Sequence, residues 1–239
     1  MIDNYEEIKA ELKDNLDRVE ENINNTLLKM GRKREDVTLL AVTKTVDSEK
    51  INAMLELGVK NIGENKAQEL TEKFPEISGD AIWHFIGHLQ TNKVKYIIDK
   101  VKLIHSLDRL SLAKEINKKA EAENIVKEVL LEVNIAEEES KFGLKKEETI
   151  PFIEQILDFK NIKIKGLMTI APFAENPEEV RYVFRDLKKL GEEIERKNYP
   201  NLEMKYYSMG MTNDYTIALE EGSNIVRIGT GLFGKRIYK

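Results

Sequence analysis

The stretch that decides the fold is residues 37–44, Val-Thr-Leu-Leu-Ala-Val-Thr-Lys, an apolar run that ends on a lysine. Its length and its β-branched residues are typical of a parallel strand covered on both faces. Such a strand delivers its last side chains to the carboxyl edge of the sheet, where α/β proteins place their ligand sites. Partial burial there lowers the pKa of a lysine and makes its amine a nucleophile toward aldehydes. Lys44 is therefore either a surface lysine at a strand end or a Schiff-base lysine.

Strand-like and helix-like segments alternate along the rest of the chain. The predicted strands are 37–43, 61–63, 83–86, 103–106, 129–134, 162–168, 205–208 and 225–228. Helical periodicity separates them, for example over 47–57, 109–123, 146–157, 178–197 and 212–221. Eight strands that alternate with helices favour an α/β fold, a (β/α)₈ TIM barrel. A doubly wound open sheet is the alternative, because strand order cannot be read from a sequence.

An amphipathic helix precedes the first strand. Apolar residues recur every three or four positions from Ile8 to Leu27 and form one stripe, and Gly31 ends the helix. This helix can serve as the eighth helix that packs against the outside of the barrel. No Pro- or Gly-rich linker divides the chain, so residues 1–239 are predicted to form a single domain with no β-domain after the barrel.

Composition excludes several classes of function. The net charge of −5 gives no attraction to nucleic acid or to anionic membranes. Cysteine is absent, which excludes disulfides, thiolate metal sites and a cysteine nucleophile. Residues 1–7 are acidic and lack the apolar core of a signal peptide, and no stretch approaches the roughly 20 apolar residues of a membrane span. We expect a cytoplasmic protein.

Two loops have the composition of an anion site. Residues 225–231, Ile-Val-Arg-Ile-Gly-Thr-Gly, run from a strand into two glycines that flank a hydroxyl, and residues 208–210 read Ser-Met-Gly. Glycines let backbone N–H groups turn toward an anion, and barrel enzymes commonly bind phosphate after strands seven and eight. The loops are either a phosphate site or ordinary turns, and the spacing of a P-loop is missing.

Charged and imidazole side chains inside the predicted strands leave alternatives open. Arg227 lies in an apolar strand, either in a buried ion pair with Glu64 or Asp214, or facing a ring nitrogen or an anion. His84 and His88 are four residues apart, a spacing that converges on a metal only in a helix. Because this segment reads as a strand, no metal site is predicted.

Longer motifs carry a resemblance that covers essentially the whole chain. The chain resembles the pyridoxal-phosphate homeostasis proteins, relatives of the barrel domain of alanine racemase with fold type III of pyridoxal 5′-phosphate (PLP) proteins. The motifs are Ala-Val-Thr-Lys at 41–44, Ile-Gly-Glu-Asn at 62–65, Trp-His-Phe-Ile-Gly-His-Leu-Gln-Thr-Asn-Lys at 83–93, Gly-Leu-Met-Thr-Ile at 166–170, Ser-Met-Gly-Met-Thr-Asn-Asp at 208–214 and Val-Arg-Ile-Gly-Thr at 226–230.

The resemblance implies a role for each site residue. Lys44 would form the internal aldimine with PLP, and Arg227 would sit beside the pyridine nitrogen and keep it unprotonated. Lys141 resembles a family lysine near the site that accepts or hands on PLP, and is otherwise a solvated loop lysine. The remaining members are the phosphate-holding Ser208, Gly229 and Thr230 with backbone help from Met209 and Gly210, and the ring-pocket residues Asn65, His88 and Met168.

The resemblance also implies carriage of the cofactor rather than catalysis. Racemisation on PLP needs an acid–base group on each face of the substrate carbanion, and in alanine racemase a tyrosine of a second subunit serves the face opposite the lysine. Among the late tyrosines Tyr206, Tyr207, Tyr215 and Tyr238, none has a reason in the sequence to be that group. We therefore predict a monomer that buffers and delivers PLP, with PLP-dependent apo-enzymes as recipients. The alternatives are a PLP-dependent amino-acid racemase or decarboxylase, and a barrel isomerase or lyase of a phosphorylated metabolite that uses Lys44.

Overall fold

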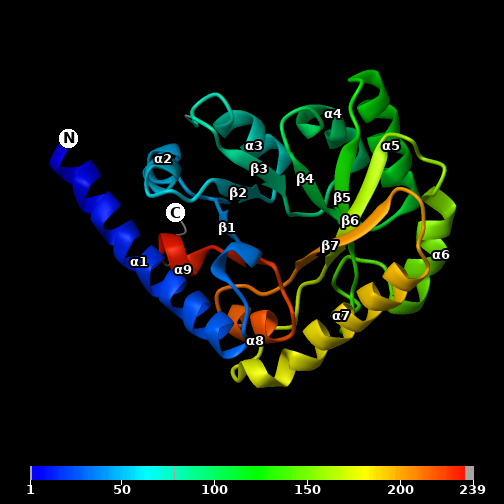
Figure 1. Ribbon diagram of the computed structural model, residues 1–239. Helices are drawn as coiled ribbons and strands as arrows, with labels where there is room; N and C mark the ends of the chain where they lie inside the picture. The colour runs from blue at the N-terminus through cyan, green and yellow to red at the C-terminus, as the bar shows by residue number, and fades with distance from the viewer. Residues whose placement is uncertain (1, 78, 235–239) are drawn as a thin grey trace.

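Eight parallel strands close into a barrel in the computed structural model, which describes residues 2–77 and 79–234 (Figure 1). Each strand pairs with the next along the chain, and β1 pairs with β8 from Thr38 opposite Ile225 to Ala41 opposite Ile228. This closure confirms the TIM barrel and excludes the open sheet. The strands are β1 (Thr38–Val42), β2 (Asn61–Glu64), β3 (Ile82–Phe85), β4 (Leu103–Leu107), β5 (Lys127–Glu132), β6 (Ile162–Met168), β7 (Leu202–Ser208) and β8 (Ile225–Ile228).

Helices surround the barrel and connect successive strands (Figure 1). They are α1 (Ile2–Lys29), α2 (Ser48–Glu56), α3 (Ala67–Lys73), α4 (Val94–Ile97), α5 (Leu110–Ala122), α6 (Lys146–Ile156), α7 (Arg181–Arg196), α8 (Tyr215–Glu220) and α9 (Thr230–Phe233), with 3₁₀ turns at Arg34–Asp36, Thr91–Lys93 and Pro177–Val180. None of the helices in the described part of the chain has the length and apolar character that crossing a bilayer requires.

The long N-terminal helix α1 covers the seam where the barrel closes. It packs against α2, α8 and α9, which belong to opposite ends of the chain (Figure 1). Asn15 Nδ2 donates to the carbonyl of Leu232 at 2.9 Å, and Arg32 donates to the carbonyls of Leu219 and Ser223, both at 2.8 Å. The helix therefore acts as the eighth cover, as its apolar stripe predicts.

The predicted segments coincide with the observed elements, with shifts at some ends. The fifth strand begins and ends two residues earlier than predicted, at Lys127–Glu132. The helix expected from residue 212 begins only at Tyr215, because the side chain of Asp214 accepts a hydrogen bond from the backbone N–H of Met211 and closes a turn there. That turn keeps residues 211–214 available to the site.

Alternation along the strands divides the side chains between two cores. One face of each strand packs against the helices, and the other points into the barrel. The interior cluster contains Leu40, Val42, Ile86, Leu103, Leu130, Met168 and Ile225. By the same alternation, Glu132 shares a face with Leu130, and Arg227 shares a face with Ile225. Glu132 and Arg227 therefore point into the barrel interior.

Candidate functional site

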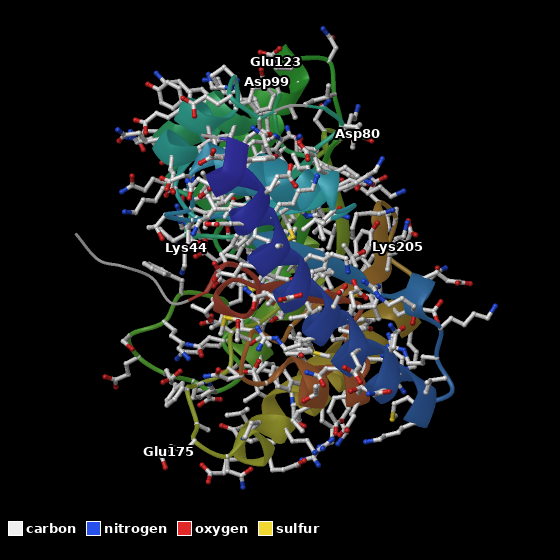
Figure 2. All side chains as sticks on the ribbon, turned by 90° about the vertical axis from the view of Figure 1, so that its left-hand side faces the viewer. Lys44, Asp80, Asp99, Glu123, Glu175 and Lys205 are labelled. Atoms are coloured by element: carbon white, nitrogen blue, oxygen red, sulfur yellow. The ribbon has the colours of Figure 1, made fainter. Side chains whose placement is uncertain are left out.

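A cavity of about 560 Å³ opens at the carboxyl ends of the strands. This volume is typical of a site for a small molecule or cofactor. Figure 2 shows the two faces of the barrel from the side of α1: Lys44 and Glu175, which follow strands, lie on one side, and Asp80, which precedes β3, lies on the other. The predicted site residues that line the cavity are Lys44, Asn65, His88, Lys141, Arg227, Gly229 and Thr230.

The neighbouring strands β1 and β8 bring Lys44 and the last glycine-rich loop to the same level of the barrel. Ala41 pairs with Ile228, and Lys44 and Gly231 each lie three residues beyond this pair. A Cβ added at Gly229 would lie 3.5 Å from Cβ of Val42, which shows how closely the two strand ends approach. The amine and the loop therefore share one wall of the cavity.

Four predicted residues, Met168, Ser208, Met209 and Gly210, do not line the cavity. Met168 is fully buried in the interior cluster, and Met209 is fully buried in the core between barrel and helices. Gly210 has a φ of +94°, and a Cβ there would lie 2.6 Å from Cβ of Ala218. On this segment the cavity lining begins at Met211, and the contact of these four residues with a ligand stays a prediction.

The side chain of Ser208 forms hydrogen bonds inside the barrel. Its Oγ accepts a hydrogen bond from Nη1 of Arg227 at 2.7 Å and lies 2.9 Å from Nδ1 of His105. The side chain is fully buried. In this position Ser208 anchors Arg227, and its role as a phosphate ligand stays a prediction.

Thr212, which was not among the predicted site residues, adds a hydroxyl to the cavity wall. It lines the cavity beside Thr230, whose Oγ1 lies 3.2 Å from Oγ1 of Thr212. The backbone N–H of Gly231 donates to Oγ1 of Thr212, also at 3.2 Å. A Cβ at position 231 would come within 2.9 Å of the Ile228 side chain, so glycine is required for this approach. The hydroxyls of Thr212 and Thr230 thus gather on the cavity wall where an anion can bind.

Arg227 lies fully within the barrel interior and reaches the cavity wall. Its Nη1 donates to Ser208 and its Nη2 donates to the carbonyl of Thr169 at 2.9 Å. Among the described residues it forms no ion pair with Glu64 or Asp214, the partners weighed from sequence. Burial lowers its pKa to about 10, while nearby Asp214 and Glu132 oppose this shift. The guanidinium therefore remains a cation near neutral pH.

A row of hydrogen bonds continues from Arg227 through the barrel. His105 Nε2 lies 2.9 Å from His84 Nδ1, and His84 Nε2 lies 3.1 Å from Oδ1 of Asn61. With the Asn61 amide assigned in this orientation, His84 must donate from Nε2, so His105 donates to His84 and accepts from the hydroxyl of Ser208. Burial lowers the pKa of His84 to about 3 and that of His105 well below its usual value, so both rings are neutral. Ser208 then presents only lone pairs to Arg227.

Glu132, which the sequence analysis missed, is a titratable group on the cavity wall. Its side chain is 6% exposed, and its Oε2 has no hydrogen-bond partner in the described part of the chain. Burial and the nearby Asp108 raise its pKa to about 7, and Arg227 and Arg109 oppose this shift. The alternation of inward- and outward-facing side chains along the fifth strand is the sequence signal that could have identified Glu132.

The mouth of the cavity carries aromatic and charged groups. The ring of His88 stacks on Phe142 with centroids 3.7 Å apart, and its Nδ1 lies 3.5 Å from a carboxylate oxygen of Asp108. Lys141 forms an ion pair with Glu138 and lines the cavity. Within residues 2–77 and 79–234, no three His, Asp or Glu side chains are arranged to hold a metal ion.

Comparisons with known proteins agree with this architecture. The alanine racemase N-terminal domain family matches residues 15–236. The chain is 48% identical over 224 residues to the pyridoxal phosphate homeostasis protein of Aquifex aeolicus, covering 93% of this chain and 97% of that protein. The barrel is thus of the alanine racemase N-terminal class, and the chain belongs to the family of pyridoxal phosphate homeostasis proteins.

Solved structures extend the comparison. A protein of unknown function from Bifidobacterium adolescentis superposes with a TM-score of 0.89 at 35% identity, over 95% of this chain and 96% of that one. PipY of Synechococcus elongatus, solved with PLP bound, superposes with a TM-score of 0.78 at 28% identity, over 89% of this chain and all of PipY. The resemblance to this family stated from sequence is confirmed.

Proposed function

We propose that the protein binds PLP covalently through Lys44 and serves to buffer and deliver this cofactor inside the cell. The observation that carries the proposal is that the Lys44 amine and the hydroxyls of Thr212 and Thr230 line the same cavity. The family membership and the PLP-bound structure of PipY support the same ligand.

The groups present fit PLP at each of its functional ends. An amine at Lys44 suits the aldehyde, and the hydroxyls of Thr212 and Thr230 suit the phosphate. Arg227 is held by Ser208 and Thr169 and lines the cavity, so its remaining N–H groups can face the pyridine nitrogen. When bound, PLP supplies an electron sink, and a cation beside the ring nitrogen weakens that sink. This arrangement favours storage over turnover.

A PLP-dependent racemase or decarboxylase is the second candidate, and Glu132 is the observation that favours it. A buried carboxyl group with a pKa of about 7 can exchange protons at neutral pH. Incubation of the PLP-loaded protein with amino acids in deuterium oxide tests this candidate. Carriage predicts no deuterium at the α-carbon above the rate of free PLP, and turnover predicts incorporation that Glu132→Gln reduces.

Absorbance spectra of the desalted protein after addition of PLP test the binding proposal. We expect a band near about 420 nm in the wild-type protein and in Lys66→Ala, whose lysine lies outside the cavity. Lys44→Ala should lack the band. A band that persists in Lys44→Ala but not in Lys141→Ala would move the covalent bond to Lys141. A wild-type protein without the band would favour a barrel isomerase or lyase of a phosphorylated metabolite.

Delivery and oligomeric state belong to the same proposal. We expect a monomer in the cytoplasm that passes PLP to PLP-dependent apo-enzymes. Sedimentation velocity tests the first part. The second is tested by mixing the loaded protein with a PLP-dependent apo-enzyme and following the recovery of that enzyme's activity.

A further inference from the structure

The turn that carries Lys44 has an unfavourable backbone conformation. Thr45, the next residue, has a φ of +61°. A β-branched residue rarely adopts this region, because its Cβ crowds the backbone. The surrounding structure must therefore hold the turn in place.

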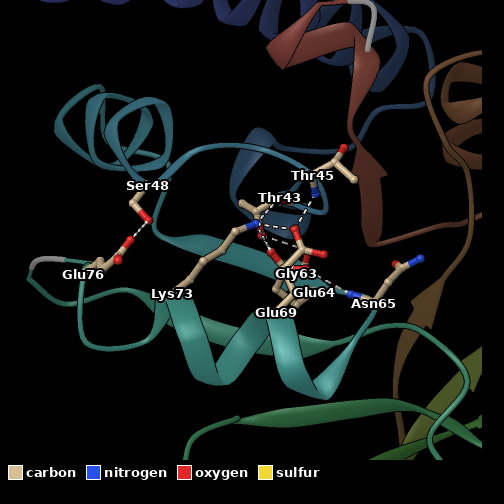
Figure 3. Close-up of polar contacts among 9 residues, drawn as sticks. All are labelled: Thr43, Thr45, Ser48, Gly63, Glu64, Asn65, Glu69, Lys73 and Glu76. Atoms are coloured by element: carbon tan, nitrogen blue, oxygen red, sulfur yellow. Dashed lines mark hydrogen bonds and ion pairs between the residues drawn. The ribbon is translucent and has the colours of Figure 1, made fainter. Parts of the chain in front are cut away.

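Two side chains of α3 contact the residues on either side of Lys44 in the sequence: Lys73 contacts Thr43, and Glu69 contacts Thr45 (Figure 3). Lys73 Nζ donates to the carbonyl oxygen of Thr43 at 2.7 Å, which ties the residue before Lys44. Oε1 of Glu69 accepts a hydrogen bond from the backbone N–H of Thr45, which ties the residue after it. Lys73 and Glu69 bind each other at 2.6 Å, so the two ties form one unit.

Glu64 of strand β2 contacts both Lys73 and Thr43 and so fixes their positions. Lys73 Nζ also donates to Oε1 of Glu64 at 2.8 Å, and the same oxygen accepts from the hydroxyl of Thr43 at 2.8 Å. The side chain of Glu64 is fully buried, and that of Lys73 is 11% exposed. Water therefore has little access with which to replace these contacts. A buried ion pair adds little net stability, but loss of one partner is costly because it leaves the other charge buried and unpaired.

We infer that Glu69 and Lys73 form a brace that holds residues 43–45 so that the Lys44 amine stays directed into the cavity. The inference rests on the proposed function, since it concerns the lysine that carries PLP. Glu69 and Lys73 are positioning residues in this role. Neither lines the cavity.

Glu69→Ala is the variant that tests the brace with least disturbance. It removes the acceptor of the Thr45 N–H and leaves Lys73 paired with Glu64, so no buried charge loses its last partner. Glu72→Ala is the matched control, because it removes the same charge from the same helix but only a contact with Gln68. Glu69→Gln keeps an acceptor oxygen and removes the charge.

The readout is the rate at which PLP is captured on Lys44, followed by borohydride reduction and peptide mass spectrometry. We expect Glu69→Ala to slow capture about tenfold, because small displacements of a reacting group carry large rate costs. Glu72→Ala and Glu69→Gln should react at close to the wild-type rate. Equal melting temperatures of Glu69→Ala and Glu72→Ala would exclude a general loss of stability as the cause.

A second substitution separates positioning from charge. Glycine adopts a positive φ without strain, so Thr45→Gly in the Glu69→Ala background should recover part of the lost rate. Capture in Glu69→Ala at the rate of Glu72→Ala would overturn the brace. So would a rate in Glu69→Gln as low as that of Glu69→Ala, because the charge and not the hydrogen bond would then matter.

Hydrogen exchange of the Thr45 amide distinguishes failure of the brace from failure of the proposed function. If the wild-type protein captures no PLP, the proposed function fails, and amide exchange still tests the brace. We expect the Thr45 N–H to be protected in the wild-type protein and in Glu72→Ala, and to exchange at least about tenfold faster in Glu69→Ala. Unchanged exchange would refute the brace whatever the protein binds.

Discussion

The carboxyl group of Glu132 combines burial with a place on the cavity wall, and its charge therefore depends on pH near neutrality. Its folded-state pKa of about 7 lies above the value near 4.5 of an exposed glutamate. The folded protein holds this proton more tightly than the unfolded chain. The resulting stabilisation is present at low pH and is lost as the pH rises through 7.

Glu132→Gln should remove this pH dependence. Between pH 5 and pH 8, the free energy of unfolding of the variant should rise relative to the wild-type protein by about 1 to 3 kcal/mol. Urea denaturation at the two pH values measures the difference. Glu128→Gln, which removes a more exposed carboxylate from the same strand, is the control. If the difference in free energy of unfolding between variant and wild type is the same at pH 5 and at pH 8, Glu132 is ionised across this range.

Substitutions at Thr212 and Ser208 test which of the two hydroxyls binds the phosphate. Thr212→Val keeps the shape of the side chain and removes its hydroxyl, so the affinity for PLP should fall about tenfold. Ser208→Ala should instead lower the free energy of unfolding by about 1 to 2 kcal/mol, because it leaves His105 and Arg227 without their shared partner. Fluorescence titration with PLP and urea denaturation of both variants separate the two roles. A larger loss of affinity in Ser208→Ala would identify Ser208 as the phosphate ligand.

At the level of elements, α1 contributes to stability through one face. Ile23 is fully buried between this helix and the barrel, whereas Leu28 on the same helix is 76% exposed. Ile23→Ala should lower the free energy of unfolding by about 2 to 4 kcal/mol, and Leu28→Ala should change it by less than about 0.5 kcal/mol. Chemical denaturation checks both. Because α1 contributes no residue to the cavity lining, PLP affinity should be unchanged in both variants.

The elements themselves could be predicted from the sequence because their signals are local. Apolar runs mark the strands, and the stripe of α1 marks its buried face. Strand pairing is not local: the register shifts between β4 and β5, β5 and β6, and β6 and β7 depend on contacts across the barrel. At Gly166, a Cβ would lie 1.9 Å from the carbonyl oxygen of Tyr206, a contact that no pattern within β6 reveals.

The site could be predicted only as far as strand ends define it. Lys44, Asn65, His88 and Thr230 lie one to three residues beyond a strand end, and they line the cavity. Thr212 was missed because the chain extends four residues beyond β7 before it reaches the cavity. Glu132 and the brace residues were missed because their roles depend on which side of a strand or helix faces the neighbouring element.

For the whole molecule, PLP should act as a stabiliser of the fold. A ligand that binds only the folded state raises the free energy of unfolding by about 2.7 kcal/mol when its concentration is a hundred times its Kd. We expect this increase for the wild-type protein in thermal or chemical denaturation with PLP. Lys44→Ala should show a smaller increase at the same concentration, and an equal increase would mean that the covalent bond adds nothing to affinity.

The filled interior of the barrel determines how cofactor can leave. Below the cavity, the interior cluster from Leu40 to Ile225 and the row from Arg227 to Asn61 occupy the centre of the barrel. If Lys44 holds PLP as proposed, the released cofactor has to leave by the face through which it entered, past Phe142 and Lys141. In that case loading and release use the same opening. A recipient protein that covers this opening while it takes the cofactor would also keep free PLP out until the two proteins separate.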